Sequence, residues 1–166
     1  MKYSHNFFIR VEKSFFILKF LELIYKLTYE SNAKKDALVG IQDILKNARA
    51  KNGPLNITGC LVYHNGNFVQ ILEGKKKDVY SLYKTIEKDS RHSNVRLISE
   101  ELDKDRSFSD WNMAYFDPVS NGFGKADLEN FERNLLLLAE FSDRLSTTVN
   151  LFWLNVRKIV LNLKMT

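Results

Sequence analysis

The sequence has few of the residues that mark several common protein classes. It holds one cysteine, Cys60, with two prolines and seven glycines among 166 residues. A single thiol excludes an internal disulfide framework and a zinc site built on cysteines, and it favours a reducing, cytoplasmic location. The scarcity of proline and glycine argues against a disordered or fibrous chain. With 45% hydrophobic residues, the chain is instead expected to bury a core of its own.

Long apolar runs are missing as well. Residues 14–24 (SFFILKFLELI) are strongly apolar, but Lys19 and Glu22 interrupt them. A membrane-spanning helix needs about 20 apolar residues, so no span is expected, and a weak membrane anchor is the alternative for this stretch. Residues 1–22 are interpreted as an N-terminal extension, either an added amphipathic helix or residues translated from too early a start codon.

The excess of positive charge is modest. The net charge is +5, and the densest basic run is Lys75-Lys76-Lys77. A solvated turn before a helix explains this run as well as a nucleic-acid contact does. The sequence shows no zinc finger, glycine-rich phosphate loop or RNA-binding signature, so a nucleic-acid partner is not expected.

Strand-like and helix-like periodicities alternate along the chain. Strands are predicted at residues 23–31, 57–63, 68–72 and 95–102, with a short fifth strand at 111–115. Helices are predicted at residues 36–51 and 76–89 from their apolar stripes. This βαββαββ order predicts an α+β, ferredoxin-like sheet with two helices on one face. Residues 127–145 and 149–163 predict a C-terminal helical hairpin that covers the other face, and a partner contact is the alternative role for it.

The stretch 52–74 (NGPLNITGCLVYHNGNFVQILEG) contains one unusual residue, Gln70. The pair Asn65-Gly66 predicts a tight hairpin turn, and His64 beside it is expected to be solvated. Gln70 shares a strand face with large apolar neighbours, where an unpartnered amide costs about 1–3 kcal/mol. Two interpretations stay open, namely a core glutamine satisfied by backbone groups and an amide that faces a ligand.

Four polar or polarisable side chains are predicted on the same face of the sheet. They are Tyr29, Gln70, Trp111 and Met113, each on the period-two face of its strand that can point at the two helices. This convergence predicts a binding site for a flat ligand between the sheet and the two helices.

Four segments in consistent order give the chain a specific resemblance. They are LTYES at 27–31, ITG at 57–59 followed by NGNFVQILEG at 65–74, DSRH at 89–92 and FSDWNM at 108–113. In these segments the chain resembles the BLUF family, blue-light sensors that use FAD. The resemblance covers about residues 23–115, and the helices beyond resemble the C-terminal cap of short, single-domain members. It implies an extension at 1–22, a flavin-binding domain at 23–117 and a helical cap at 118–166.

The resemblance also assigns roles by position. It implies that Tyr29 is the electron and proton donor beside the flavin and that Gln70 is the switching glutamine between them. Asn52 matches the amide that binds the pyrimidine end of the ring. The remaining implied site residues are the apolar pair Ile44 and Ile86, the polar corner Asp89, Arg91 and His92, and the mobile pair Trp111 and Met113.

The implied function is a blue-light photoreceptor without substrate turnover. Light would rearrange the Tyr29–Gln70–flavin hydrogen bonds, and the last strand would pass the change to the C-terminal helices. No effector domain is expected, so the output would be a contact with a protein partner or with a second copy of the chain.

The sequence departs from the pattern of the BLUF family at two positions. Lys51 stands where many members have a second polar residue, and Thr85 stands where members often place an arginine for the phosphate, with Lys84 or Lys88 as substitutes.

Two other functions are considered beside the photoreceptor. An enzyme on the same fold is one rival, although Glu73, His64 and His92 show no spacing that supports a catalytic pair. A flavin-free interaction module is the other.

Overall fold

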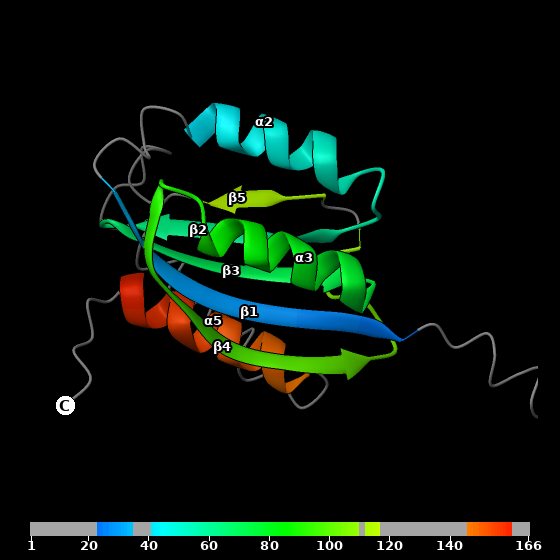
Figure 1. Cartoon of the computed structure of the whole chain (residues 1–166). Coiled ribbons are helices and arrows are strands. Elements are labelled where there is room, and N and C mark those ends of the chain that lie inside the picture. Colours follow the sequence, from blue (N-terminus) through cyan, green and yellow to red (C-terminus); the bar gives the residue numbers. More distant parts are fainter. Residues whose placement is uncertain (1–22, 35–40, 110–111, 117–145, 161–166) are drawn as a thin grey trace, which may run out of the picture.

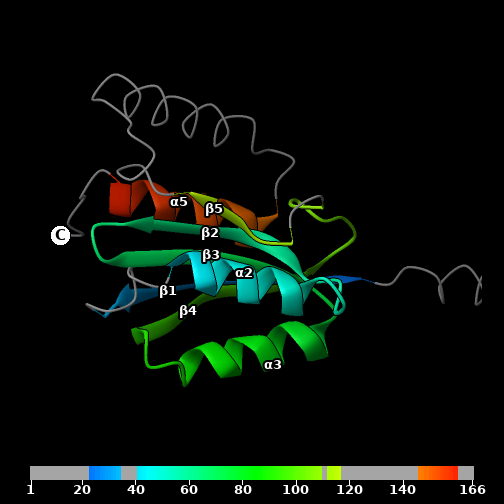
Figure 2. The same ribbon diagram turned by 90° about the horizontal axis from the view of Figure 1, so that it is seen from above.

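In the part of the chain that the structure describes, a five-stranded sheet carries α2 and α3 on one face and α5 on the other (Figure 1, Figure 2). The computed structural model describes residues 23–34, 41–109, 112–116 and 146–160. The strands are β1 (Ile24–Ala33), β2 (Thr58–His64), β3 (Asn67–Gly74), β4 (His92–Asp103) and β5 (Ala114–Phe116). The helices are α2 (Ile41–Asn52), α3 (Lys76–Glu87) and α5 (Thr147–Val160). The expected α+β, ferredoxin-like fold is confirmed.

The strand order places β1 and β3 side by side inside the sheet. The order is β4-β1-β3-β2-β5, with antiparallel pairing except between β2 and β5, which run parallel. Tyr29 on β1 is directly paired with Gln70 on β3. Because paired residues of adjacent strands point to the same face, these two side chains emerge together.

The turn between β2 and β3 has the predicted conformation. Asn65 and Gly66 both have positive φ, 47° and 77°, as a tight two-residue hairpin turn requires. Gly59 meets a different demand, because a Cβ at its position would lie 2.0 Å from the carbonyl oxygen of Ile71 on β3. Only glycine therefore fits where β2 passes β3 at this point.

Each face of the sheet has its own apolar core. On the face covered by α2 and α3, the core includes Tyr25, Leu27, Tyr29, Leu45, Leu61, Leu72, Val79 and Tyr83. On the face covered by α5, it includes Cys60, Val62, Val69, Ile71, Phe108, Val149, Phe152 and Val156. Burying each large apolar side chain stabilises the fold by about 1.5–3 kcal/mol. The predicted cover of the free face is thus confirmed for α5, and the other predicted helix, 127–145, lies outside the described residues.

Three local predictions need correction. β4 begins at His92 and not at residue 95 as predicted, because its pairing with β1 extends to Ala33, which opposes His92. β5 has only three residues, because it pairs solely along Cys60–Val62 of β2, and Met113 precedes it. His64, predicted to be solvated, is only 6% exposed at the end of a strand that is buried over its whole length.

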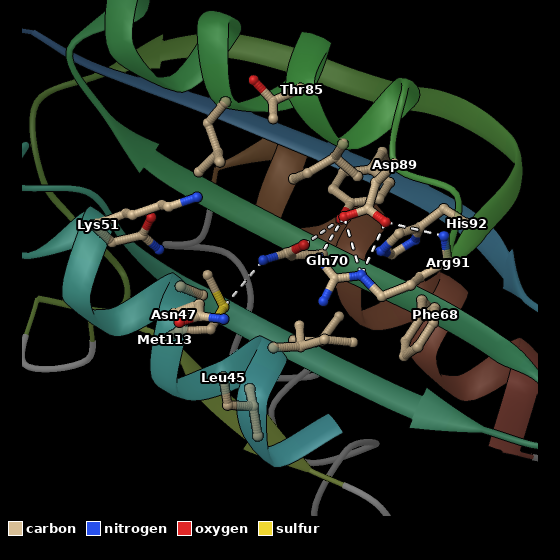
Figure 3. Close-up of a pocket in the computed structure, with 17 residues that line it drawn as sticks. Leu45, Asn47, Lys51, Phe68, Gln70, Thr85, Asp89, Arg91, His92 and Met113 are labelled. Atoms are coloured by element: carbon tan, nitrogen blue, oxygen red, sulfur yellow. Dashed lines mark hydrogen bonds and ion pairs between the residues drawn. The ribbon is translucent and has the colours of Figure 1, made fainter. Parts of the chain in front are cut away.

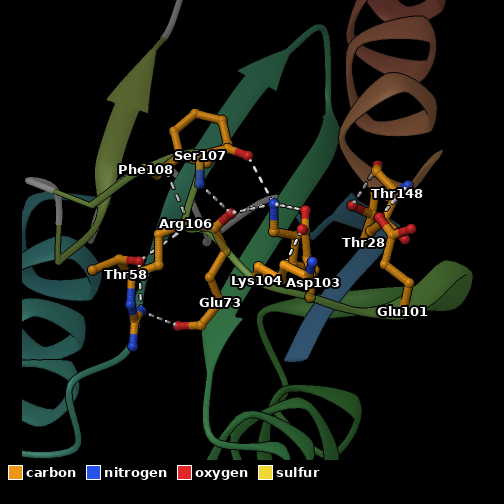
Figure 4. Close-up of polar contacts among 11 residues, drawn as sticks. Thr28, Thr58, Glu73, Glu101, Asp103, Lys104, Arg106, Ser107, Phe108 and Thr148 are labelled. Carbon is orange, nitrogen blue, oxygen red and sulfur yellow. Dashed lines mark hydrogen bonds and ion pairs between the residues drawn. The ribbon is translucent and has the colours of Figure 1, made fainter. Parts of the chain in front are cut away.

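A buried ionic cluster fastens the loop after β4 to the sheet (Figure 4). Glu73 and Lys26 are 0% and 1% exposed, with Nζ of Lys26 3.6 Å from Oε1 of Glu73. The Glu73 carboxylate also accepts hydrogen bonds from the backbone N–H groups of Ser107 (2.9 Å) and Phe108 (3.0 Å). Arg106 donates to the Glu73 carbonyl at 2.8 Å. Glu73, considered above as a candidate acid, therefore has a structural set of partners.

Candidate functional site

A pocket lies between α2, α3 and the sheet (Figure 3). Of the residues predicted for the site, those that the structure describes all line it: Tyr29, Ile44, Asn52, Gln70, Ile86, Asp89, Arg91, His92 and Met113. Trp111, also predicted, lies outside the described residues. Residues that are far apart in the sequence thus meet around one cavity.

Gln70 links two other side chains in the wall of this pocket. The hydroxyl of Tyr29 donates a hydrogen bond to Oε1 of Gln70, and Nε2 of Gln70 donates to Sδ of Met113 over 3.1 Å. Gln70 is 6% exposed. Its amide is therefore satisfied by side chains and not by the backbone groups that the first interpretation expected.

Tyr29 is a buried, neutral phenol. It is 0% exposed, and its ring centre lies 5.5 Å from that of Tyr83 on α3. Burial, with smaller contributions from Tyr83 and Asp89, raises the pKa of Tyr29 well above its ordinary value. The hydroxyl therefore keeps its proton and stays a donor to Gln70.

Asn52, at the end of α2, leaves one polar atom without a partner. Its Nδ2 donates to the Asn112 carbonyl over 3.0 Å, whereas its buried Oδ1 accepts no hydrogen bond from any described residue. Asn52 is 1% exposed and lines the pocket. An unsatisfied buried acceptor costs about 1–3 kcal/mol, so a ligand that presents an N–H group fits this position.

The polar corner after α3 is held by charge and by local hydrogen bonds. Nε of Arg91 lies 2.9 and 3.1 Å from the two carboxylate oxygens of Asp89, and the Arg91 side chain lowers the pKa of Asp89 to about 2. His92 shares a 2.8 Å hydrogen bond with Ser31 and packs against Phe68, with ring centres 5.0 Å apart. Burial lowers the pKa of His92, so this ring favours its neutral form.

The pocket walls from the helices are mainly apolar. Ile44 on α2 and Ile86 on α3 are both half-buried and both line the cavity. Sequence reasoning missed Asn47 and Leu82 as further lining residues. Asn47 follows Ile44 by three positions and Leu82 precedes Ile86 by four, so the helical repeat of each predicted wall residue could have found them.

The two departures from the family pattern also fall in the pocket. Lys51 and Thr85 both line it, and the Thr85 hydroxyl donates to the Ser81 carbonyl at 3.0 Å. Lys84, one proposed substitute for a phosphate-binding arginine, pairs with Glu87 at 2.7 Å. Lys51 is therefore the better-placed cation for an anionic part of a ligand.

Comparison with known proteins identifies the family of this chain. A family model described as sensors of blue-light using FAD, abbreviated BLUF, matches residues 24–114. That range contains the pocket residues from Tyr29 to Met113. The chain belongs to the BLUF family, blue-light sensors.

Curated relatives are much longer than this chain. The photoactivated adenylate cyclase subunit beta of Euglena longa is 36% identical over 89 residues, which cover 52% of this chain and 10% of the relative. The blue light- and temperature-regulated antirepressor BluF of Escherichia coli is 29% identical over 96 residues, covering 57% of this chain and 24% of the relative. The chain therefore spans a quarter or less of the length of these two proteins.

Solved structures of BLUF proteins match over most of the chain. The dark-state structure of the BLUF protein BlrB has a TM-score of 0.61 at 28% identity and covers 87% of this chain and 100% of its own. The photo-activated state of BlsA has a TM-score of 0.60 at 29% identity, with coverages of 86% and 99%. Within the described residues, no helix is long and apolar enough to span a membrane, and no group of three or more His, Cys, Asp or Glu side chains is suited to hold a metal ion.

Proposed function

We propose that this protein is a blue-light photoreceptor that binds FAD in the pocket between α2 and α3. The observation that carries the proposal is the linked set Tyr29, Gln70 and Met113 in the pocket wall. Among the described residues, the side-chain amide of Gln70 is bonded to a phenol and a thioether, so it can exchange these partners without breaking the sheet. FAD is the cofactor named in the description of the family.

The lining residues fit a flavin. Ile44 and Ile86 offer apolar surfaces from the two helices to a flat ring. The unpartnered Oδ1 of Asn52 would accept a hydrogen bond from the imide N–H of that ring. Lys51 would supply positive charge for the phosphates. FAD itself would supply the absorption of blue light and an excited state that accepts an electron.

The chain's own contribution would be a proton held between Tyr29 and Gln70. A phenol that loses an electron becomes a strong acid, and the acceptor in contact with the Tyr29 hydroxyl is Oε1 of Gln70. When both the electron and the proton have returned to Tyr29, the Gln70 amide would be left tautomerised or rotated. In the rotated form, Oε1 would face the Met113 sulfur, which has no hydrogen to donate, so the contact between Gln70 and Met113 would be lost.

The output would begin at Met113. Its carbonyl accepts a hydrogen bond from Nε of Arg49 over 3.1 Å, and the next residue, Ala114, starts the short strand β5. A released Met113 would loosen this strand end and act on the cap, residues 118–166. The partner would be a protein, either a regulator or effector or a second copy of the chain. Residues 23–117 would form the flavin-binding domain.

The absorption spectrum of the purified chain loaded with FAD tests this function. We expect a flavin band that shifts slightly to the red under blue light and returns in darkness. A flavin band that does not shift would contradict the sensor mechanism. A chain that takes up no FAD would contradict flavin binding and would favour the flavin-free interaction module.

A further inference from the structure

The strand that carries Tyr29 also touches α5, from the other side of the sheet. Successive side chains of a strand point to opposite faces. Tyr29 points into the pocket between α2 and α3, and its neighbour Thr28 points toward α5 (Figure 4). One peptide unit of β1 therefore joins the pocket to the C-terminal helix.

Four side chains hold the first turn of α5 against the sheet. The Thr28 hydroxyl donates to the Thr148 carbonyl at 3.3 Å, and the hydroxyls of Thr148 and Ser99 are hydrogen-bonded at 2.9 Å. The backbone N–H of Thr148 donates to Oε1 of Glu101 at 2.7 Å. Thr28 and Thr148 are both 0% exposed. We refer to Thr28, Ser99, Glu101 and Thr148 as the α5 clamp.

The α5 clamp supplies a negative charge that the first turn of α5 itself lacks. The first turn of α5 contains no acidic residue, although negative charge near a helix N-terminus stabilises it. Glu101 provides that charge from β4 by accepting the N–H of Thr148. The stability of the first turn of α5 therefore depends on where the sheet places Glu101 and Thr28.

The sheet is irregular at the same step. Thr28 is paired with Ser99, but Tyr29 is paired with Leu97, so the register between β1 and β4 shifts between Thr28 and Tyr29 and Ile98 has no opposite residue. Such a bulge interrupts the ladder and bends the strand locally. A reorientation of Tyr29 is therefore less constrained by β4 here than in a regular ladder.

We propose that the α5 clamp transmits the light-driven change at Tyr29 through β1 to the first turn of α5, in addition to the route through Met113. The inference rests on the proposed photoreceptor function. When Tyr29 and Gln70 change their hydrogen bond, the tilt of the peptide between residues 28 and 29 weakens the contacts of Thr28, Ser99 and Glu101 with Thr148. The N-terminal turn of α5 then opens more often in the light than in the dark.

Hydrogen exchange of the FAD-loaded full chain, in darkness and under blue light, tests the clamp. The variants are Thr28→Val and Thr148→Val, which keep the side-chain shape and remove one hydroxyl each. Ser93→Ala is the matched control, because the Ser93 hydroxyl also joins β4 to β1, at the Asn32 carbonyl (3.3 Å), away from α5. The absorption spectrum of each sample is recorded in parallel.

We expect all samples to show the red shift. The wild type and Ser93→Ala should show faster exchange in the light at the first turn of α5, and both valine variants should lose this difference. If the valine variants are too unstable to purify, Glu101→Gln should reduce the same difference, since it removes the charge and keeps an acceptor. Equal light-dependent differences in the variants and the wild type would overturn the clamp.

Two further outcomes separate this inference from the function on which it rests. A wild type that shifts its spectrum and shows no light-dependent exchange in α5 would overturn the clamp and leave the sensor intact. A wild type without any spectral shift would contradict the photoreceptor function, and the clamp as a light-driven device would fall with it.

Discussion

Tyr29 and Gln70 are directly paired across two central strands, and the Tyr29 hydroxyl donates to the Gln70 side-chain oxygen in the wall of the pocket. Cross-strand pairing keeps the two residues side by side, so a change of their hydrogen bond can begin in the side chains. The strands can therefore stay in register while the hydrogen bond between the two residues changes.

The unpartnered oxygen of Asn52 predicts a loss of flavin affinity on substitution. Asn52→Leu removes the acceptor that would bind the ring and also the donor to Asn112. One lost hydrogen bond corresponds to about a tenfold weaker Kd for FAD, measured by equilibrium titration. Asn155→Ala on α5, which loses a bond to the Leu151 carbonyl, is the control. Equal affinity of Asn52→Leu and wild type would show that Asn52 does not bind the ring.

Removal of Lys26 should cause a large loss of stability, because it leaves the buried Glu73 carboxylate, and the Asp103 carboxylate 2.7 Å from Nζ of Lys26, without this cation. In Lys26→Met, the free energy of unfolding in urea should fall by about 3 kcal/mol. Lys84→Met is the control, since Lys84 also pairs with a carboxylate at 2.7 Å, that of Glu87, but is exposed, and it should change stability little. A larger loss for Lys84→Met than for Lys26→Met would contradict the assignment of Glu73 and Lys26 as the anchor of the loop.

Asp89 predicts a specific pH dependence of stability. Because its pKa in the folded chain is about 2 and its ordinary value is 3.8, the unfolded chain binds the proton more readily. The stabilisation from Asp89 is therefore fully present above its ordinary pKa and is lost as the pH falls toward about 2. The stability difference between wild type and Asp89→Asn should be constant from about pH 5 to about pH 7, because this range lies about one unit or more above the ordinary pKa of Asp. The difference should shrink at lower pH. A difference that grows on acidification would contradict the Asp89–Arg91 pairing.

We expect the thiol of Cys60 to be unreactive in the native protein. It is 5% exposed in the core beneath α5, and burial raises its pKa to about 12, so little thiolate is present at neutral pH. As the chain has a single cysteine, a colorimetric thiol reagent should report no reaction in the native state and one equivalent in denaturant. Rapid labelling of the native protein would show that α5 leaves this face of the sheet readily.

Much of the fold follows from local patterns in the sequence. The Asn-Gly turn and the alternation around Tyr29 and Gln70 are sufficient to predict the β2–β3 hairpin and the face that bears the pocket. The apolar repeat of residues 149–163 predicts α5 and its buried side. These predictions hold because each depends on residues that are close together in the sequence.

The features that the sequence did not predict depend on distant partners. His92 belongs to β4 because of Ala33, and His64 is buried because β2 is covered on both faces. The position of Glu73 gives no sign of the Lys26 and Arg106 contacts that make it structural. The unpartnered oxygen of Asn52 likewise becomes visible only when Asn112 is seen to occupy the other end of the amide.

The most direct test of the account is the light-minus-dark absorption spectrum of the FAD-loaded wild type beside Gln70→Leu. Leucine retains the size of the side chain and removes both the acceptor for Tyr29 and the donor to Met113. We expect both proteins to carry the flavin band and only the wild type to shift it reversibly to the red. A reversible red shift of equal size in Gln70→Leu would contradict the claim that the Gln70 amide is the element that light rearranges.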